Sequence, residues 1–330
     1  IINKPTLLEI EFQKVKKSSI DFLKKDKENP FNICFEKWRK IVYSNHPYAF
    51  NTNGNLNDVS NITYEDILGE FKNFKNREKF IISNNSEING ENLETFNQKI
   101  FVEKPYSKNY DLNLLNRFDC IDNNDSNQTI LMLGNQTCSR RSSEFLPLKV
   151  LESYLSYGMS AALFKLFREK NGITYDLGVF NPIRSGNAPF LVYLSVSNSN
   201  ALFAFELLSS LWKNLLLNPL PDAEILLAKE KLKGSFLLGN QCLDEILQRN
   251  IQLISYGILP NSEIDLNTEI DKISSLDILK VTNKYFSKPF LSVSGNKNIC
   301  LKINTRWIKN LLFQKIGVQT LLVHETFVFL

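Results

Sequence analysis

The segment from residue 157 to residue 197 constrains the fold most strongly, because it joins a helix and two strands through short connections. Its helical part runs to Lys170 and ends at Asn171-Gly172, a common C-terminal stop. Strands are predicted at 173–180 and 190–197, and the short turn-rich connection between them favours antiparallel pairing. A helix beside an antiparallel pair, with more helices after it, predicts an α+β fold built in layers.

The rest of the chain extends this pattern. Ser142-Ser143 is expected to cap the helical region that ends at Lys170, and Gly158 should interrupt it. In this region Lys149 and Glu152 break up an apolar run, which predicts a largely amphipathic helix. Further helices are predicted after Pro30, after Thr63, at 201–217, after Asp222, at 243–256 and at 276–286. Further strands are predicted at 79–83, 129–133 and 290–294. A loop is predicted at 46–61.

Length and composition exclude several classes of protein. A chain of 330 residues is long enough for two domains, and 43% hydrophobic with 22% charged residues is typical of a globular protein. The net charge of +4 comes from interleaved basic and acidic residues, so no nucleic-acid surface is expected. No uninterrupted apolar stretch reaches roughly 18 residues, so no membrane span is predicted. We predict domains at 1–93 and 127–308, a linker at 94–126 and an unassigned tail at 309–330.

Histidine and cysteine content limits the chemistry. The two histidines, His46 and His324, are far apart, and the chain has no His-x-x-Glu-His or Cys-x-x-Cys motif. A zinc site made from this chain alone is therefore not expected, and neither histidine is predicted to bind a metal. The five cysteines are scattered and odd in number. This argues against a disulfide framework and favours a reducing compartment, the cytoplasm.

Several short motifs occur in a defined order. The first half of the chain contains the motifs at 35–43 and His46-Pro47-Tyr48. The second half contains Leu163-Phe164 and the motifs at 167–170 and 172–175. Their order and spacing resemble the insulinase-type metallopeptidases of family M16, from residue 5 to residue 300. The resemblance implies two layered α+β lobes with antiparallel-rich sheets and covering helices, the first lobe being incomplete.

The resemblance also singles out Arg168 and Tyr175, which are seven residues apart. In the family an Arg and a Tyr at this spacing lie opposite the zinc and help hold the substrate backbone. A guanidinium and a phenol can both donate hydrogen bonds to a carbonyl or a developing oxyanion. The purely structural alternative is that Arg168 complements the dipole of its helix and Tyr175 is an ordinary half-buried strand residue.

The catalytic part of the family pattern is missing from the chain. In the family that the chain resembles, the zinc motif is His-x-x-Glu-His. The third zinc ligand of that family is a Glu about 75 residues after the motif. The position of that third ligand falls near Lys24, with Asp21 and Asp26 close by. A lysine would oppose a zinc ion rather than bind it. The segment 24–39 resembles a zinc-less, non-catalytic group of the family. No catalytic residue, metal ligand or cofactor is assigned to this chain, and zinc is expected only in a partner subunit or an upstream segment.

Three functions are compatible with these features. The favoured one is a non-catalytic subunit that binds and helps enclose peptides or unfolded proteins for a zinc-bearing M16 homologue, as a heterodimer or in a homo-oligomer. The second is the C-terminal portion of an active zinc endopeptidase whose His-x-x-Glu-His segment lies upstream of residue 1. The third is a structural or assembly protein of the same fold. The missing upstream sequence would distinguish the first two.

Overall fold

The computed structural model describes residues 5–44, 46–76, 117–122, 126–239, 241–258 and 266–309. The predicted strand at 79–83, His324 and nearly all of the predicted tail lie outside these residues. Within them, no helix combines the length and the apolar character needed to cross a membrane.

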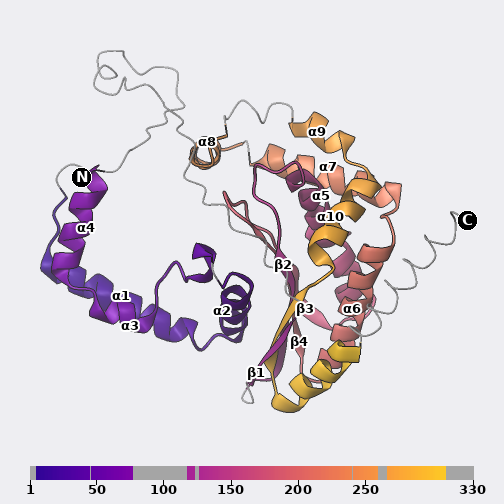
Figure 1. Cartoon of the computed structure of the whole chain (residues 1–330), viewed down its shortest axis with the longest axis horizontal. Helices are drawn as coiled ribbons and strands as arrows, with labels where there is room; N and C mark the ends of the chain where they lie inside the picture. Colours follow the sequence, from indigo (N-terminus) through magenta and orange to yellow (C-terminus); the bar gives the residue numbers. More distant parts are fainter. Residues whose placement is uncertain are drawn as a thin grey trace, which may run out of the picture.

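A mixed five-stranded sheet forms the centre of the molecule (Figure 1). Its strand order is β1-β5-β2-β4-β3, in which β1 runs parallel to β5 and the other neighbours are antiparallel. The predicted antiparallel pair is therefore confirmed as β3 and β4, and the mixed α/β architecture confirms the predicted layers. The strands are β1 (Phe118–Asp122), β2 (Gln128–Gln136), β3 (Thr174–Phe180), β4 (Pro189–Ser197) and β5 (Phe290–Gly295).

The central strand β2 is buried on both faces of the sheet. Its side chains alternate between two apolar clusters, with Leu131 and Leu133 in one and Ile130 and Met132 in the other. Successive side chains of a strand point to opposite faces, so each cluster marks one face. A strand covered on both sides reads as a continuous apolar run, which is what residues 129–133 show.

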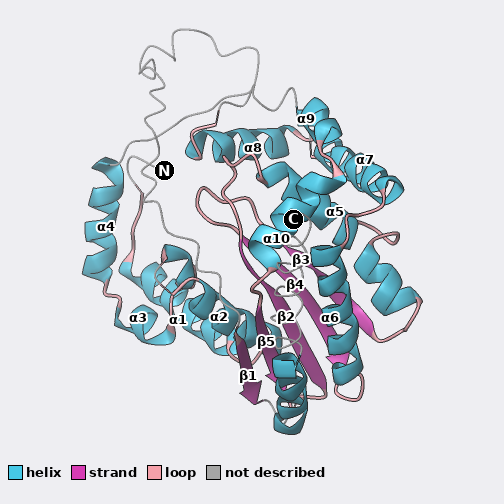
Figure 2. Cartoon of the chain, turned by 45° about the vertical axis from the view of Figure 1, so that its right-hand side comes forward, coloured by secondary structure: helices cyan, strands magenta, loops and turns pink. Residues whose placement is uncertain are grey.

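Helices from the second half of the chain cover one face of the sheet (Figure 2). The larger cluster joins this face to the inner helices, where Phe205, Leu208 and Phe286 are almost completely buried. The Trp212 indole donates a hydrogen bond to the Phe286 carbonyl at 3.0 Å and so ties two of these helices together. These helices are α5 (Phe145–Ser156), α6 (Ala201–Leu217), α7 (Asp222–Leu238), α9 (Leu266–Lys272) and α10 (Ser275–Phe286), with α8 (Leu243–Ser255) beside them.

A helix from the start of the chain covers the other face. In α2 (Pro30–Val42), Cys34, Trp38 and Val42 recur every four residues and so share one side of the helix. All three are fully buried against β2 and β5. The remaining N-terminal helices extend away from the sheet on the side of α2 (Figure 1); they are α1 (Glu9–Asp26), α3 (Leu56–Asn61) and α4 (Tyr64–Asn76).

Several sequence predictions need correction. The predicted loop at 46–61 contains the short 3-10 helix η1 (Pro47–Ala49) and α3, whose first turn is capped by the Asn55 side chain accepting from the Asp58 amide at 2.9 Å. The expected cap at Ser142-Ser143 lies before the helix, since α5 begins at Phe145 with Glu144 at its N-cap, and the Ser142 hydroxyl accepts from the Glu144 amide at 3.2 Å. Part of the region assigned to the linker forms β1, while the domain boundaries themselves stay predictions. Two helices that the sequence did not indicate are α9 and a helix at 297–309.

The cysteines also differ from expectation. Cys120 of β1 and Cys300 of the last helix form a disulfide, with a Cα–Cα distance of 6.0 Å. Cys34, Cys138 and Cys242 are free thiols, and the first two are buried. Scattered spacing in the sequence did not exclude pairing, because the fold brings together two cysteines separated by 180 positions.

Candidate functional site

Arg168 lies in an unusual helical segment. The helix predicted to reach Lys170 is broken at Gly158, as expected, and continues as the π-helical η3 (Phe164–Glu169). The Lys170 amide donates to the Lys165 carbonyl at 3.0 Å, the five-residue step of a π-helix. Short π-helical segments inside helices often occur at functional sites. The Arg168 side chain is exposed, and its guanidinium lies 5.0 Å from the centre of the Phe164 ring.

The turn after Arg168 links it to the outer strand of the sheet. Gly172 has φ of +59°, a conformation that glycine adopts without a steric penalty. Its amide donates to the Arg168 carbonyl, and the Ile173 amide donates to the Phe167 carbonyl at 3.0 Å. Both bonds span one residue more than in a Schellman cap, which fits the wider π-helical turn. The predicted stop at Asn171-Gly172 is thus confirmed.

Tyr175 is the second residue of β3. The pairing of β3 with β4 shifts between Thr174 and Asp176, so the backbone of Tyr175 lies at a bulge. Bulges re-aim side chains and are common beside functional sites. The structure thus places Arg168 and Tyr175 on either side of one turn; their predicted role in holding substrate stays a prediction.

Strand β3 ends the sheet in the described part of the chain. It pairs with β4 on one side, and its other side is the edge of the sheet. An edge strand offers unpaired amide and carbonyl groups to an incoming strand. Phe180, 36% exposed at the end of β3, packs edge-on against Phe35 of α2 at 5.2 Å between ring centres. This edge can accept an extended peptide through main-chain hydrogen bonds.

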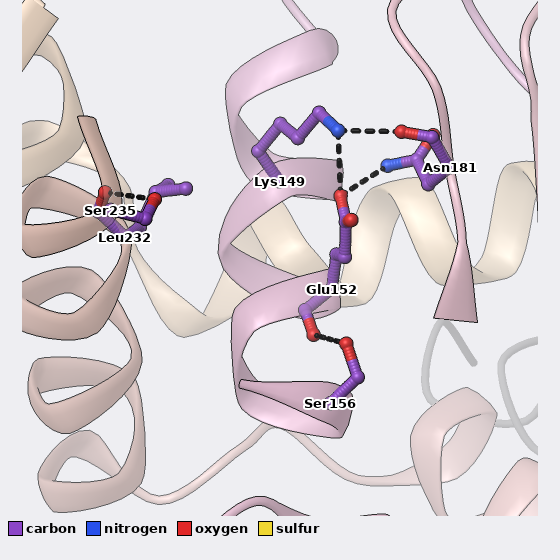
Figure 3. A network of polar contacts seen from close by, with 6 residues as sticks. All are labelled: Lys149, Glu152, Ser156, Asn181, Leu232 and Ser235. Carbon is purple, nitrogen blue, oxygen red and sulfur yellow. Dashed lines mark hydrogen bonds and ion pairs between the residues drawn. The ribbon is translucent and has the colours of Figure 1, made fainter. Parts of the chain in front are cut away.

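A second polar cluster lies inside the helical layer (Figure 3). Lys149 and Glu152, one turn apart on α5, are 7% and 8% exposed and form an ion pair of 2.7 Å. Asn181, just after β3, joins both: its carbonyl accepts from Lys149 at 2.6 Å and its amide donates to Glu152 at 3.0 Å. Burial raises the pKa of Glu152, although Lys149 and a hydrogen bond from Tyr157 act in the opposite direction. The sequence predicted a largely amphipathic helix here, but these two charges do not lie on a solvated side, because α7 and α8 flank that part of α5.

His46 belongs to an aromatic cluster at the junction of the N-terminal segment with the sheet. Its Nδ1 accepts from the Tyr48 amide at 3.0 Å, and its ring lies 4.3 Å from that of Tyr48 and 5.5 Å from that of Tyr43. Burial lowers the pKa of its imidazole. The Tyr43 hydroxyl donates to the Asn187 carbonyl at 2.8 Å, which ties the cluster to the loop between β3 and β4.

The resemblance places the family's third zinc ligand near the end of α1. Lys24 is an exposed residue in the last turn of α1, and Asp26 at the end of this helix accepts from the Asn32 amide. Among the described residues no group of three or more His, Cys, Asp or Glu side chains could hold a metal ion. The prediction that zinc belongs to another subunit or segment is untested by this observation.

Comparisons with known proteins agree with this architecture. Residues 61–232 match the family model described as the peptidase M16 inactive domain. A protein named uncharacterized zinc protease from Rickettsia felis is 23% identical to this chain, over 87% of this chain and 70% of the relative's own length. A protein of the same name from Rickettsia bellii is 22% identical, over 82% of this chain and 67% of its own length. Among solved structures, the peptidase M16 inactive domain from Pseudomonas fluorescens superposes with a TM-score of 0.72 at 17% identity, covering 89% of this chain and 72% of that one. The structure of a protease from Helicobacter pylori superposes with a TM-score of 0.70 at 14% identity, covering 87% of this chain and 72% of that one.

Proposed function

The chain belongs to the peptidase M16 family, and from this premise we propose that it is a non-catalytic subunit that binds peptides and helps enclose them for a zinc-bearing partner. The observation that carries the proposal is the edge of β3, with which no other described strand pairs, shortly after the exposed Arg168. A peptide added to this edge gains main-chain hydrogen bonds, which give affinity with little sequence preference. Arg168 and Tyr175 would donate hydrogen bonds to its carbonyl groups.

The partner in this proposal is a catalytic M16 homologue, in a heterodimer, or another copy of the chain in a homo-oligomer. Zinc and the general base that activates water would come from that partner. The match to a domain described as inactive supports this division of labour. Peptides or unfolded proteins are the proposed substrates, because an edge strand pairs only with extended backbone.

The second candidate is the C-terminal portion of an active zinc endopeptidase. The names of the Rickettsia relatives favour it, and the chain covers only 70% and 67% of their length. In this case a His-x-x-Glu-His motif would precede residue 1 of the sequence described here. The third candidate, a structural or assembly protein, shares its fold with a chain of the Complex III2 structure from Candida albicans, at 14% identity and a TM-score of 0.64.

Zinc content and peptide hydrolysis separate the first two candidates. Both are measured on the full-length purified protein, alone and mixed with a catalytic M16 homologue. A non-catalytic subunit is expected to contain no stoichiometric zinc and to support hydrolysis only in the mixture. Stoichiometric zinc with hydrolysis by the protein alone would reject the non-catalytic proposal and establish the second candidate.

Replacing Arg168 tests the peptide-contact role. We expect Arg168→Ala to lower hydrolysis by the mixture roughly 100-fold, the usual effect of removing a donor to a reacting carbonyl. Thermal stability should change little, because the side chain is exposed. Lys170→Ala is the matched control, since it removes an exposed cation two residues away. Equal hydrolysis by wild type, Arg168→Ala and Tyr175→Phe would favour the structural or assembly protein.

A further inference from the structure

A cavity of about 610 Å³ lies between α5, α7 and α8. This volume is in the range of sites that bind small molecules. Its lining includes apolar side chains from two helices, Leu232 and Phe236 of α7 and Ile251 of α8. Leu253 is the buried residue of α8, whereas Ile251 is 47% exposed and so is accessible from the cavity. The walls therefore suit a ligand with an apolar body.

The charged groups of the lining include more cations than anions. Lys149 of α5 and Arg249 of α8 are cationic, and Glu245 is the carboxylate of the lining. Lys149 is the most enclosed of the three, at 7% exposure. A ligand group that accepts hydrogen bonds and carries negative charge fits this set best, because Lys149 is an enclosed cationic donor.

The network around Lys149 leaves one of its donors for such a group. A lysine ammonium has three donors, and two of them point to Glu152 and to the Asn181 carbonyl. The ammonium also lies 5.8 Å from the centre of the Phe145 ring, and the described residues show no hydrogen-bond acceptor for its third donor. Glu152, by contrast, accepts from Lys149, Asn181 and Tyr157, so its carboxylate is already well supplied with donors.

The burial of this pair is also hard to explain by stability alone. Removing two charges from water costs several kcal/mol per ion, and a buried ion pair is seldom better than apolar residues of the same size. Charged groups buried at the wall of a cavity are candidates for a binding role. Burial raises the pKa of Glu152, which agrees with a pair held in a poorly solvated place.

We propose that this cavity binds a small carboxylate with an apolar body, such as the free C-terminus of a short apolar peptide, with Lys149 as the residue that contacts the carboxylate. The apolar part would lie against Leu232, Phe236 and Ile251. This inference does not rest on the proposed function, because its residues are distinct from the β3 edge and from Arg168.

Calorimetric titration of the full-length protein tests the proposal. N-acetyl-Leu-Phe with a free carboxylate is compared with its C-terminal amide, and octanoate serves as a carboxylate without a peptide backbone. We expect the free acid to bind at least 10-fold more tightly than the amide. Equal binding of acid and amide, or no binding of either carboxylate, would overturn the proposal. Binding of octanoate alone, lost with Lys149, would confirm the carboxylate site and identify its ligand as a fatty carboxylate.

Variants separate recognition from folding. Lys149→Met alone leaves Glu152 buried without its cation, so the informative variant is the double replacement Lys149→Met/Glu152→Gln, in which the amide can still accept from Asn181. It should fold and bind the acid at least 10-fold more weakly.

Glu152→Gln alone keeps Lys149 and removes an opposing charge, so it should bind the acid at least as tightly as wild type. Lys229→Met, on the same α7 that lines the cavity but bonded to the Asp271 carbonyl, is the matched control with unchanged binding. Wild-type binding by the folded double variant would refute the role of Lys149.

Discussion

At the scale of single residues, the buried pair of Lys149 and Glu152 is the feature most sensitive to substitution. We expect Lys149→Met to lower the free energy of unfolding by roughly 3–5 kcal/mol, because it leaves a carboxylate buried without its cation. The double variant Lys149→Met/Glu152→Gln should recover most of this loss, since no buried charge remains. Urea unfolding of wild type and both variants measures the difference. Equal loss in the single and double variants would show that the pair acts only through packing.

His46 makes stability depend on pH. Burial holds the pKa of His46 in the folded protein below its ordinary value, so the unfolded chain takes up the proton first as the pH falls. The contribution of His46 is therefore complete above pH 6.5 and is lost as the pH falls through the folded pKa. We expect the urea midpoint to drop between pH 7.5 and pH 5, a range chosen around the ordinary pKa of about 6.5.

His46→Asn is the control for this titration. Asparagine can also accept a hydrogen bond from the Tyr48 amide, as N-cap residues do, but it does not titrate. The drop in midpoint should be smaller in this variant than in wild type. An identical pH profile for the two proteins would assign the pH dependence to other groups.

At the scale of elements, the contact between β2 and β4 leaves no room at Gly134. A Cβ atom there would lie 2.0 Å from the Phe190 carbonyl oxygen of the paired strand. We expect Gly134→Ala to cost about 3 kcal/mol or more, because the backbone of β4 cannot move aside cheaply. Gly234→Ala is the matched control: it lies within α7, nothing is within 4 Å of its added Cβ, and alanine should stabilise the helix by about 1 kcal/mol. Thermal unfolding of both variants checks the two signs.

The elements that the sequence predicted well have local causes. Asn171-Gly172 ends its helix because glycine accepts a positive φ there, and Thr63 with Asp66 forms the cap of α4 through reciprocal bonds. Elements that depend on distant partners were missed. The short strand β1 is a strand because β5 pairs with it, and α3 is a six-residue helix with the Asn55 side chain as its cap.

Features of the candidate site also divide into those that a local sequence pattern indicates and those that depend on distant parts of the chain. Arg168 was singled out through a motif, whereas no residue pattern in the segment indicates its π-helical turn. The burial of Lys149 and Glu152 was missed for a related reason. Charges in an apolar run usually mark the solvated side of a helix, and only the position of the neighbouring helices shows that they face inward.

At the scale of the whole molecule, the disulfide joins two distant parts of the chain. A bridge between residues separated by 180 positions is expected to stabilise the fold by about 5 kcal/mol, through the restriction of the unfolded chain. The double variant Cys120→Ser/Cys300→Ser should unfold at a correspondingly lower urea concentration. Cys242→Ser, which removes an exposed free thiol, is the control and should unfold like wild type.

Counting free thiols tests whether the disulfide is formed and, with it, the cellular compartment of the protein. Titration of the denatured, unreduced protein should find three free thiols out of five if the disulfide is formed. Five thiols in protein taken directly from the cell would support the predicted cytoplasmic location, where thiols stay reduced. Three would place the protein in an oxidising compartment.

The position of α2 determines how the molecule would respond to being divided. This helix is separated along the chain from the sheet that it covers, and its face of Cys34, Trp38 and Val42 is sealed completely against β2 and β5. A chain interrupted between α2 and β1 would leave an apolar surface on each piece. The two fragments, produced together, should therefore reassemble without a covalent link, whereas the piece that begins at β1, produced alone, should aggregate through the uncovered sheet.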